Sequence, residues 1–128
     1  MANAYTNYKA KLSTSALTTV YTVPTATTAI IKSIRISNED TENNCNISLY
    51  LVDSDSVSYN LEIDRTVKAK QTAELLATGV SNAGYGSVDS SFAPATAIVV
   101  KESEVIKAQA QNGNDLSIII SVLEVSST

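Results

Sequence analysis

The segment CNISLYLV, residues 45–52, decides the fold class because its side chains alternate with a period of two. Apolar side chains occupy every second position, namely Cys45, Ile47, Leu49 and Leu51. Between them lie Asn46, Ser48 and Tyr50. Such alternation is typical of a β-strand with one face on a core and the other in water. We therefore expect Cys45 to be a small buried residue rather than a nucleophile.

Further strand patterns lie on both sides of this segment. We expect strands at residues 17–23, 29–37, 57–63, 97–100, 105–109 and 116–125. Pro24 ends the first of them because proline cannot donate to a ladder. Residues 66–76 have a mixed pattern, which we interpret as one strand or two short strands in preference to a helix. In residues 57–63 we expect four side chains to point inward, namely Val57, Tyr59, Leu61 and Ile63.

About seven to nine short strands separated by turns predict an all-β fold, a single antiparallel β-sandwich or jelly roll. The 128 residues fit one domain, and no repeat or linker divides them. We expect residues 12–128 to form the sandwich. Residues 1–11 are polar and are interpreted either as an N-terminal arm or as an edge strand. Residues 78–95 hold three of the four glycines and predict a long surface loop.

Composition excludes several classes of function. The net charge is −4, with nine Lys and Arg, which is too few cations for a nucleic-acid binder. Histidine is absent and Cys45 is the only cysteine, so we expect no imidazole-based triad, no ordinary zinc, copper or haem site and no other cofactor. The sequence has no run of about 20 apolar residues and no signal-peptide pattern, so we expect no membrane partner and synthesis in the cytoplasm.

Four aromatic residues are candidates for contacts with a partner. Tyr5 and Tyr8 are the only aromatic side chains of the N-terminal segment. Tyr85 lies between two glycines in the long loop, and Phe92 follows it. Tyrosine is favoured in the cores of interfaces. The alternatives are that residues 1–11 form a plain edge strand and that Phe92 pins the loop onto the sandwich.

The last strand pattern is apolar on both faces in its middle, at Ile118, Ile119 and Ile120. A strand covered on both sides fits the centre of a sandwich or a strand that also packs on a partner subunit. Ile118 and Ile120 are therefore candidates for a subunit interface, and core packing explains them equally well.

Two phrases resemble small virion proteins of tailed phages, especially phages that infect cyanobacteria. They are LSTSALTTVYTVPTATTAIIKSIRISNED at residues 12–40 and EVIKAQAQNGNDLSIIISVLEVS at residues 104–126. The similar features are a Thr-rich strand closing on Val-Pro, an Ile-Lys-Ser-Ile-Arg strand and a Val-Ile-Lys-Ala-Gln strand before a Val-rich end. The resemblance covers about half of the chain, and residues 78–95 depart from it. It implies no catalytic residues.

The resemblance implies a structural protein of the virion, and a capsid decoration or cement protein fits it best. The expected partners are further copies of the chain, as a homo-oligomer and in particular a trimer, and the major capsid protein or other virion proteins. A neck, tail or baseplate component is the alternative within this class. A carbohydrate-binding module for host attachment is the alternative from another class, although the absence of Trp weighs against it. We do not expect an enzyme.

Overall fold

The computed structural model describes residues 2–12, 14–76, 97–111 and 116–126. They form nine strands, and no helix occurs among them: β1 (Ala2–Leu12), β2 (Thr18–Thr22), β3 (Thr27–Asn38), β4 (Cys45–Val52), β5 (Ser58–Val67), β6 (Thr72–Glu74), β7 (Ile98–Val100), β8 (Val105–Ala110) and β9 (Leu116–Ser126). The segment quoted first therefore coincides with β4. Residues 66–76 divide between the end of β5 and the short strand β6.

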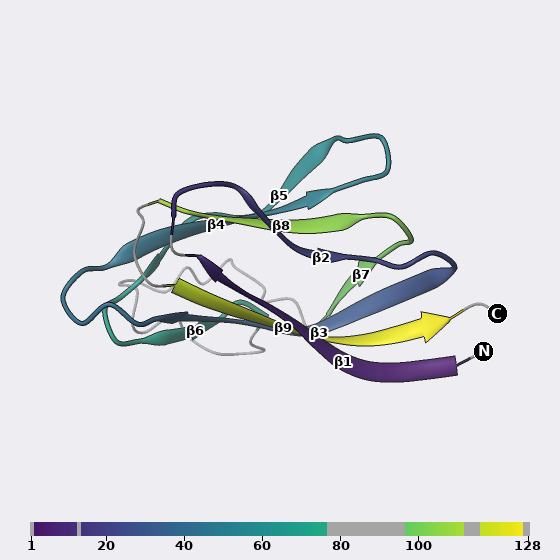
Figure 1. The fold of residues 1–128 in the computed structure, drawn as a ribbon, viewed down its shortest axis with the longest axis horizontal. Coiled ribbons are helices and arrows are strands. Elements are labelled where there is room, and N and C mark those ends of the chain that lie inside the picture. Colours follow the sequence, from purple (N-terminus) through teal and green to yellow (C-terminus); the bar gives the residue numbers. More distant parts are fainter. Residues whose placement is uncertain (1, 13, 77–96, 112–115, 127–128) are drawn as a thin grey trace, which may run out of the picture.

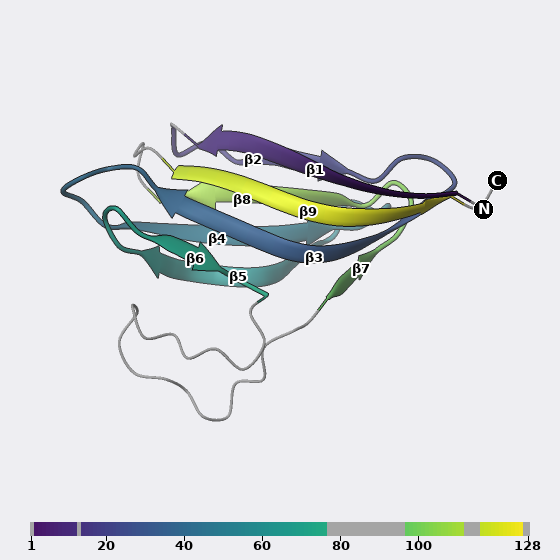
Figure 2. The same cartoon turned by 90° about the horizontal axis from the view of Figure 1, so that it is seen from below.

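The strands form two antiparallel sheets packed face to face. Sheet A has the order β1-β9-β3-β6, and β7 also pairs with β3, while sheet B has the order β2-β8-β4-β5. Figure 1 shows the sheets as two layers, with sheet A below and sheet B above. Figure 2 looks onto the outer face of sheet A, where β1, β9 and β3 lie side by side. The predicted all-β sandwich is confirmed.

The core lies between the sheets and is built from alternate residues of each strand. Its largest aliphatic side chains are at most 1 % exposed: Leu12, Ile31, Ile34, Ile36, Ile47, Leu49, Ile106, Leu116, Ile118 and Ile120. Each such side chain stabilises the fold by about 1.5–3 kcal/mol relative to an exposed position. Cys45 is 1 % exposed and belongs to the same cluster, as its position in the alternation predicts.

Residues 1–11 were open to two interpretations, and the structure has a strand there. β1 pairs with β9 at every position from Ala2 opposite Ser126 to Leu12 opposite Leu116. It stands at the edge of sheet A because only β9 pairs with it in the sheet order. The predicted loop at residues 78–95 lies outside the part of the chain that the structure describes.

The burial predicted for Val57, Tyr59 and Ile63 is wrong, since they are 46 %, 53 % and 64 % exposed, and Leu61 is half-buried. Tyr59 stands opposite Leu51 and so projects to the core side of sheet B, but it lies near the end of the hairpin, where it stays exposed. Register shifts on both sides of Leu49 bring Glu62 rather than Ile63 opposite Leu49, so the inward direction fails at Ile63. β5 is also the edge of sheet B, and in Figure 1 the end of its hairpin with β4 extends past the neighbouring strands.

Candidate interaction surface on the outer face of sheet A

An apolar row crosses the outer face of sheet A. Tyr5 of β1 stands opposite Leu123 of β9, Leu123 opposite Ile30 of β3, and Ile30 opposite Val99 of β7. Residues that face each other in a ladder project to the same side of the sheet, so the four side chains form one line. Tyr5 is 81 % and Val99 57 % exposed, while Ile30 and Leu123 are half-buried. We call these four residues the apolar row.

Basic side chains flank the apolar row. A register shift between Ile31 and Ser33 interrupts the alternation of β3, so that exposed Lys32 and half-buried Ser33 both lie between buried Ile31 and Ile34. Further along the face, Lys9, Ile119 and Arg35 stand opposite one another across β1, β9 and β3.

This face is basic although the chain as a whole carries a net charge of −4. Of its two carboxylates, Glu39 forms an ion pair with Lys11 at 2.6 Å. The other, Glu74, accepts hydrogen bonds from the Ser33 hydroxyl and from the backbone N–H of Ile34. Neither of the two ion pairs among the described residues includes Lys9, Lys32 or Arg35.

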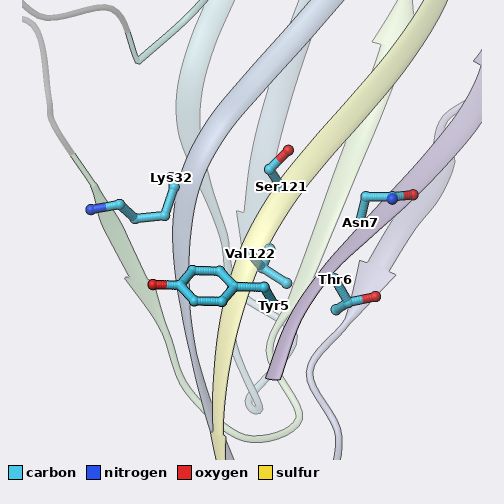
Figure 3. A pocket seen from close by; sticks show the side chains of 6 residues that line it. All are labelled: Tyr5, Thr6, Asn7, Lys32, Ser121 and Val122. Carbon is cyan, nitrogen blue, oxygen red and sulfur yellow. The ribbon is translucent and has the colours of Figure 1, made fainter. Parts of the chain in front are cut away.

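Figure 3 shows the Tyr5 end of the row. The Tyr5 ring extends from β1 across β9 toward β3, where Lys32 lies on the far side of the strand. Together with Thr6, Asn7, Ser121 and Val122, these two residues line an open hollow on the sheet. An open hollow with a projecting aromatic ring suits contact with another protein surface better than enclosure of a small molecule.

A second group of aromatic residues lies between the sheets. The Tyr8 and Tyr21 rings are stacked with their centroids 4.1 Å apart. Both hydroxyls donate to Oε2 of Glu124, at 2.7 Å each. Burial, followed by these hydrogen bonds and the carboxylate charge, raises the pKa of Tyr8 to about 12 and the pKa of Tyr21 further still. Glu124 thus joins β1 and β9 of sheet A to β2 of sheet B.

The residues proposed from sequence as partner contacts lie in different environments. Tyr5 is exposed on the sheet face, whereas Tyr8 is half-buried and its hydroxyl is bound within the chain. Ile118 and Ile120 are both 0 % exposed and pack in the core, while Ile119 between them is 41 % exposed on the outer face. Tyr85 and Phe92 lie outside the described residues.

Sequence reasoning missed three members of the apolar row: Ile30, Leu123 and Val99. The signal that could have found them is an apolar residue at a position where the alternation calls for a polar one. Buried Ala29 and Ile31 flank Ile30, and Val99 directly precedes buried Val100. Sequence alone does not place these residues in one line, because that requires the register of four strands.

Other kinds of site are not supported within the described part of the chain. No group of three or more His, Cys, Asp or Glu side chains there could hold a metal ion. Asp53, in the turn between β4 and β5, accepts backbone hydrogen bonds from Asp55 and Val57 with one carboxylate oxygen. It therefore acts as a turn residue. Among the described residues, no helix has the length and apolar character to cross a membrane.

No known family model matches the chain, and no curated protein matches its sequence. Among solved structures, a similar chain comes from work titled "Bacillus endospore appendages form a novel family of disulfide-linked pili". The TM-score is 0.53 and the sequence identity 5 %, with 99 % of this chain and 88 % of the other covered. At this identity the likeness shows a shared fold.

Proposed function

We propose that this chain is a structural subunit of a phage particle, and more narrowly a decoration protein that binds the capsid as a homo-oligomer. The observation that carries the proposal is the apolar row, which presents Tyr5 and Val99 to water in one line across four strands. Covering large apolar side chains with a partner removes their surface from water, which favours association.

Two further observations support this role. The phrases at residues 12–40 and 104–126 resemble phage virion proteins, and the first of them contains Ile30 while the second contains Leu123. The structurally similar chain belongs to a study of pili, so a related sandwich serves there in an assembled structure. Both observations favour a structural protein over an enzyme.

The assembly would differ from that neighbour in one respect. The neighbour's pili are disulfide-linked, whereas this chain has one cysteine, Cys45, which is buried in the core. With one cysteine per copy, an intermolecular disulfide can join only two copies. Contacts among more than two copies of this chain would therefore be non-covalent.

The rigidity of the sandwich suits the proposed role. Three members of the apolar row lie on β1, β9 and β3, and β9 pairs with both of the other strands over most of their length, while Val99 lies on β7, which pairs with β3. Glu124 holds β1 to the opposite sheet through its hydrogen bonds with two tyrosines. A surface fixed in this way binds a partner without losing much further conformational entropy.

The copy number of the chain in purified phage particles tests the proposal. Calibrated mass spectrometry should give between one copy of this chain per major capsid protein and one copy per few capsid proteins. A ratio of a few per hundred would place the chain in the neck, tail or baseplate instead. Absence from purified particles would contradict a role in the virion altogether.

A further inference from the structure

A second exposed apolar patch lies on the other sheet and carries the opposite charge. Val57 directly precedes β5 and Tyr59 is its second residue, and they are 46 % and 53 % exposed. Asp53 and Asp55 lie in the turn that joins β4 to β5. We call these four residues the hairpin tip.

The hairpin tip is rigid and its surroundings are acidic. One oxygen of Asp53 accepts the backbone N–H groups of Asp55 and Val57, and the backbone N–H of Asp53 donates to the Val57 carbonyl. Val52 pairs with Val105, so the turn at residues 101–104 lies at the same end of sheet B. The carboxylates of Glu102 and Glu104 in that turn accept the backbone N–H groups of Ala26 and Lys101. Asp53 and Asp55 are therefore the carboxylates that lie beside Val57 and Tyr59.

The two patches match in chemistry but cannot meet within one molecule. The apolar row belongs to the outer face of sheet A, and the hairpin tip projects from sheet B on the opposite side of the molecule (Figure 1). Each patch contains an exposed tyrosine and an exposed valine, and their flanking charges are opposite in sign.

We propose that the apolar row of one copy of this chain binds the hairpin tip of a second copy. Pairing two apolar rows would place the lysines Lys9 and Lys32 of both copies in one interface. Pairing two hairpin tips would do the same with Asp53 and Asp55. Like charges across an interface are unfavourable. Pairing unlike patches covers the exposed tyrosine and valine of each patch and brings opposite charges together. This rests on the proposed structural role and specifies which surfaces of two copies meet.

The geometry of such a contact determines the kind of assembly. A contact between two different patches is heterologous, so it closes into a ring or continues as a filament. A trimer with cyclic symmetry is a ring of this kind. A few side chains on each side make a small interface, so we expect weak association that depends on protein concentration and decreases with ionic strength.

Sedimentation equilibrium of the purified chain tests the contact. We expect Tyr5→Ser and Tyr59→Ser each to raise the dissociation constant about tenfold or more, because each removes the exposed aromatic side chain of one patch. Ile63→Ser is the matched control. Ile63 is 64 % exposed but belongs to neither patch, and its replacement should leave association unchanged. Circular dichroism and thermal melts establish that every variant is folded.

A charge exchange tests the pairing of opposite patches. Lys32→Glu and Asp55→Lys should each weaken association, and the double variant should regain most of the lost affinity because each interface again pairs opposite charges. Lys68→Glu, at an exposed lysine away from both patches, is the control for net charge.

Mixing blocked variants distinguishes a heterologous contact from a symmetric one. A Tyr5→Ser/Lys32→Glu variant keeps only its hairpin tip, and a Tyr59→Ser/Asp55→Lys variant keeps only its apolar row. Each should be monomeric alone, and an equimolar mixture should form one-to-one dimers and nothing larger. The proposal is overturned if either blocked variant still self-associates, if the mixture stays monomeric, or if the wild-type chain is monomeric at about 1 mM. None of these outcomes affects the copy-number test, which needs only the virion.

Discussion

At the scale of single residues, Glu124 of β9 links strands of both sheets. Its Oε2 atom accepts hydrogen bonds from Tyr8 and Tyr21, which belong to different sheets and stack on each other. Hydrogen bonds to a charged acceptor are roughly twice as strong as neutral ones. The carboxylate favours the protonated form of both phenols, so the contact depends on tyrosine ionisation.

The first prediction is a loss of stability at alkaline pH. Tyrosines of the unfolded chain ionise near pH 10, about two units below the pKa of about 12 that Tyr8 has in the fold. Between these values the folded state binds more protons than the unfolded state, so stability decreases as pH rises. The contribution of Tyr8 is complete below pH 10 and is lost by about pH 12, while that of Tyr21, whose pKa is raised further, is still decreasing there. Urea unfolding at a series of pH values from 8 to about 11.5 measures it.

The matched variants for this measurement are phenylalanine substitutions. A Tyr8→Phe/Tyr21→Phe chain keeps both rings but lacks the ionisable hydroxyls, so its stability should depend less on pH in this range. Tyr59→Phe changes an exposed tyrosine away from the cluster and should retain the wild-type slope. Equal slopes for the cluster variant and the wild type would show that Glu124 does not couple the two phenols to folding.

At the scale of elements, the N-terminal strand offers the sharpest prediction. A detached arm could be removed without cost, whereas β1 contributes Leu12 to the core and Tyr8 to the aromatic stack. Loss of a buried leucine alone costs about 2–5 kcal/mol, and a domain has only about 5–15 kcal/mol in total. Deleting residues 1–12 would also expose the edge of β9 to aggregation. We expect this chain to be insoluble or unfolded.

Deleting only residues 1–6 is the control. It removes exposed Tyr5 but retains Tyr8 and Leu12, so we expect a soluble and folded chain with a lower melting temperature. Soluble yield and far-UV circular dichroism compare the two deletions. A folded, stable product of the longer deletion would mean that β1 packs too weakly to count as part of the sandwich.

The strands also show how much of this structure can be predicted from the sequence. The alternation of apolar and polar residues is a local property, and it located β4 at residues 45–52 and the ends of β9 within about one residue. It failed in β5 because a register shift depends on the partner strand, which the sequence does not identify. The apolar row was missed for the same reason: its four members come from four strands. Of its residues, only Tyr5 was found from sequence, because an aromatic side chain is conspicuous in a polar segment.

At the scale of the whole molecule, the described core is one cluster with contributions from both sheets. A chain held together in this way should unfold in one cooperative step, because neither sheet retains a covered face once the other is lost. The stacked pair Tyr8 and Tyr21 lies between the sheets and reports on their packing in near-UV circular dichroism. Far-UV circular dichroism reports on the strands.

We therefore expect the near-UV and far-UV signals to change at the same temperature when the chain is heated at a concentration where it is monomeric. The Tyr8→Phe/Tyr21→Phe variant identifies which part of the near-UV signal arises from the stack. If the near-UV signal is lost first, the sheets separate or loosen before the strands melt, and the sandwich has two independently stable layers. The apolar row is treated as a fixed binding surface because sheet A packs on sheet B. Early loss of the near-UV signal would show that this packing does not hold the outer face of sheet A rigid.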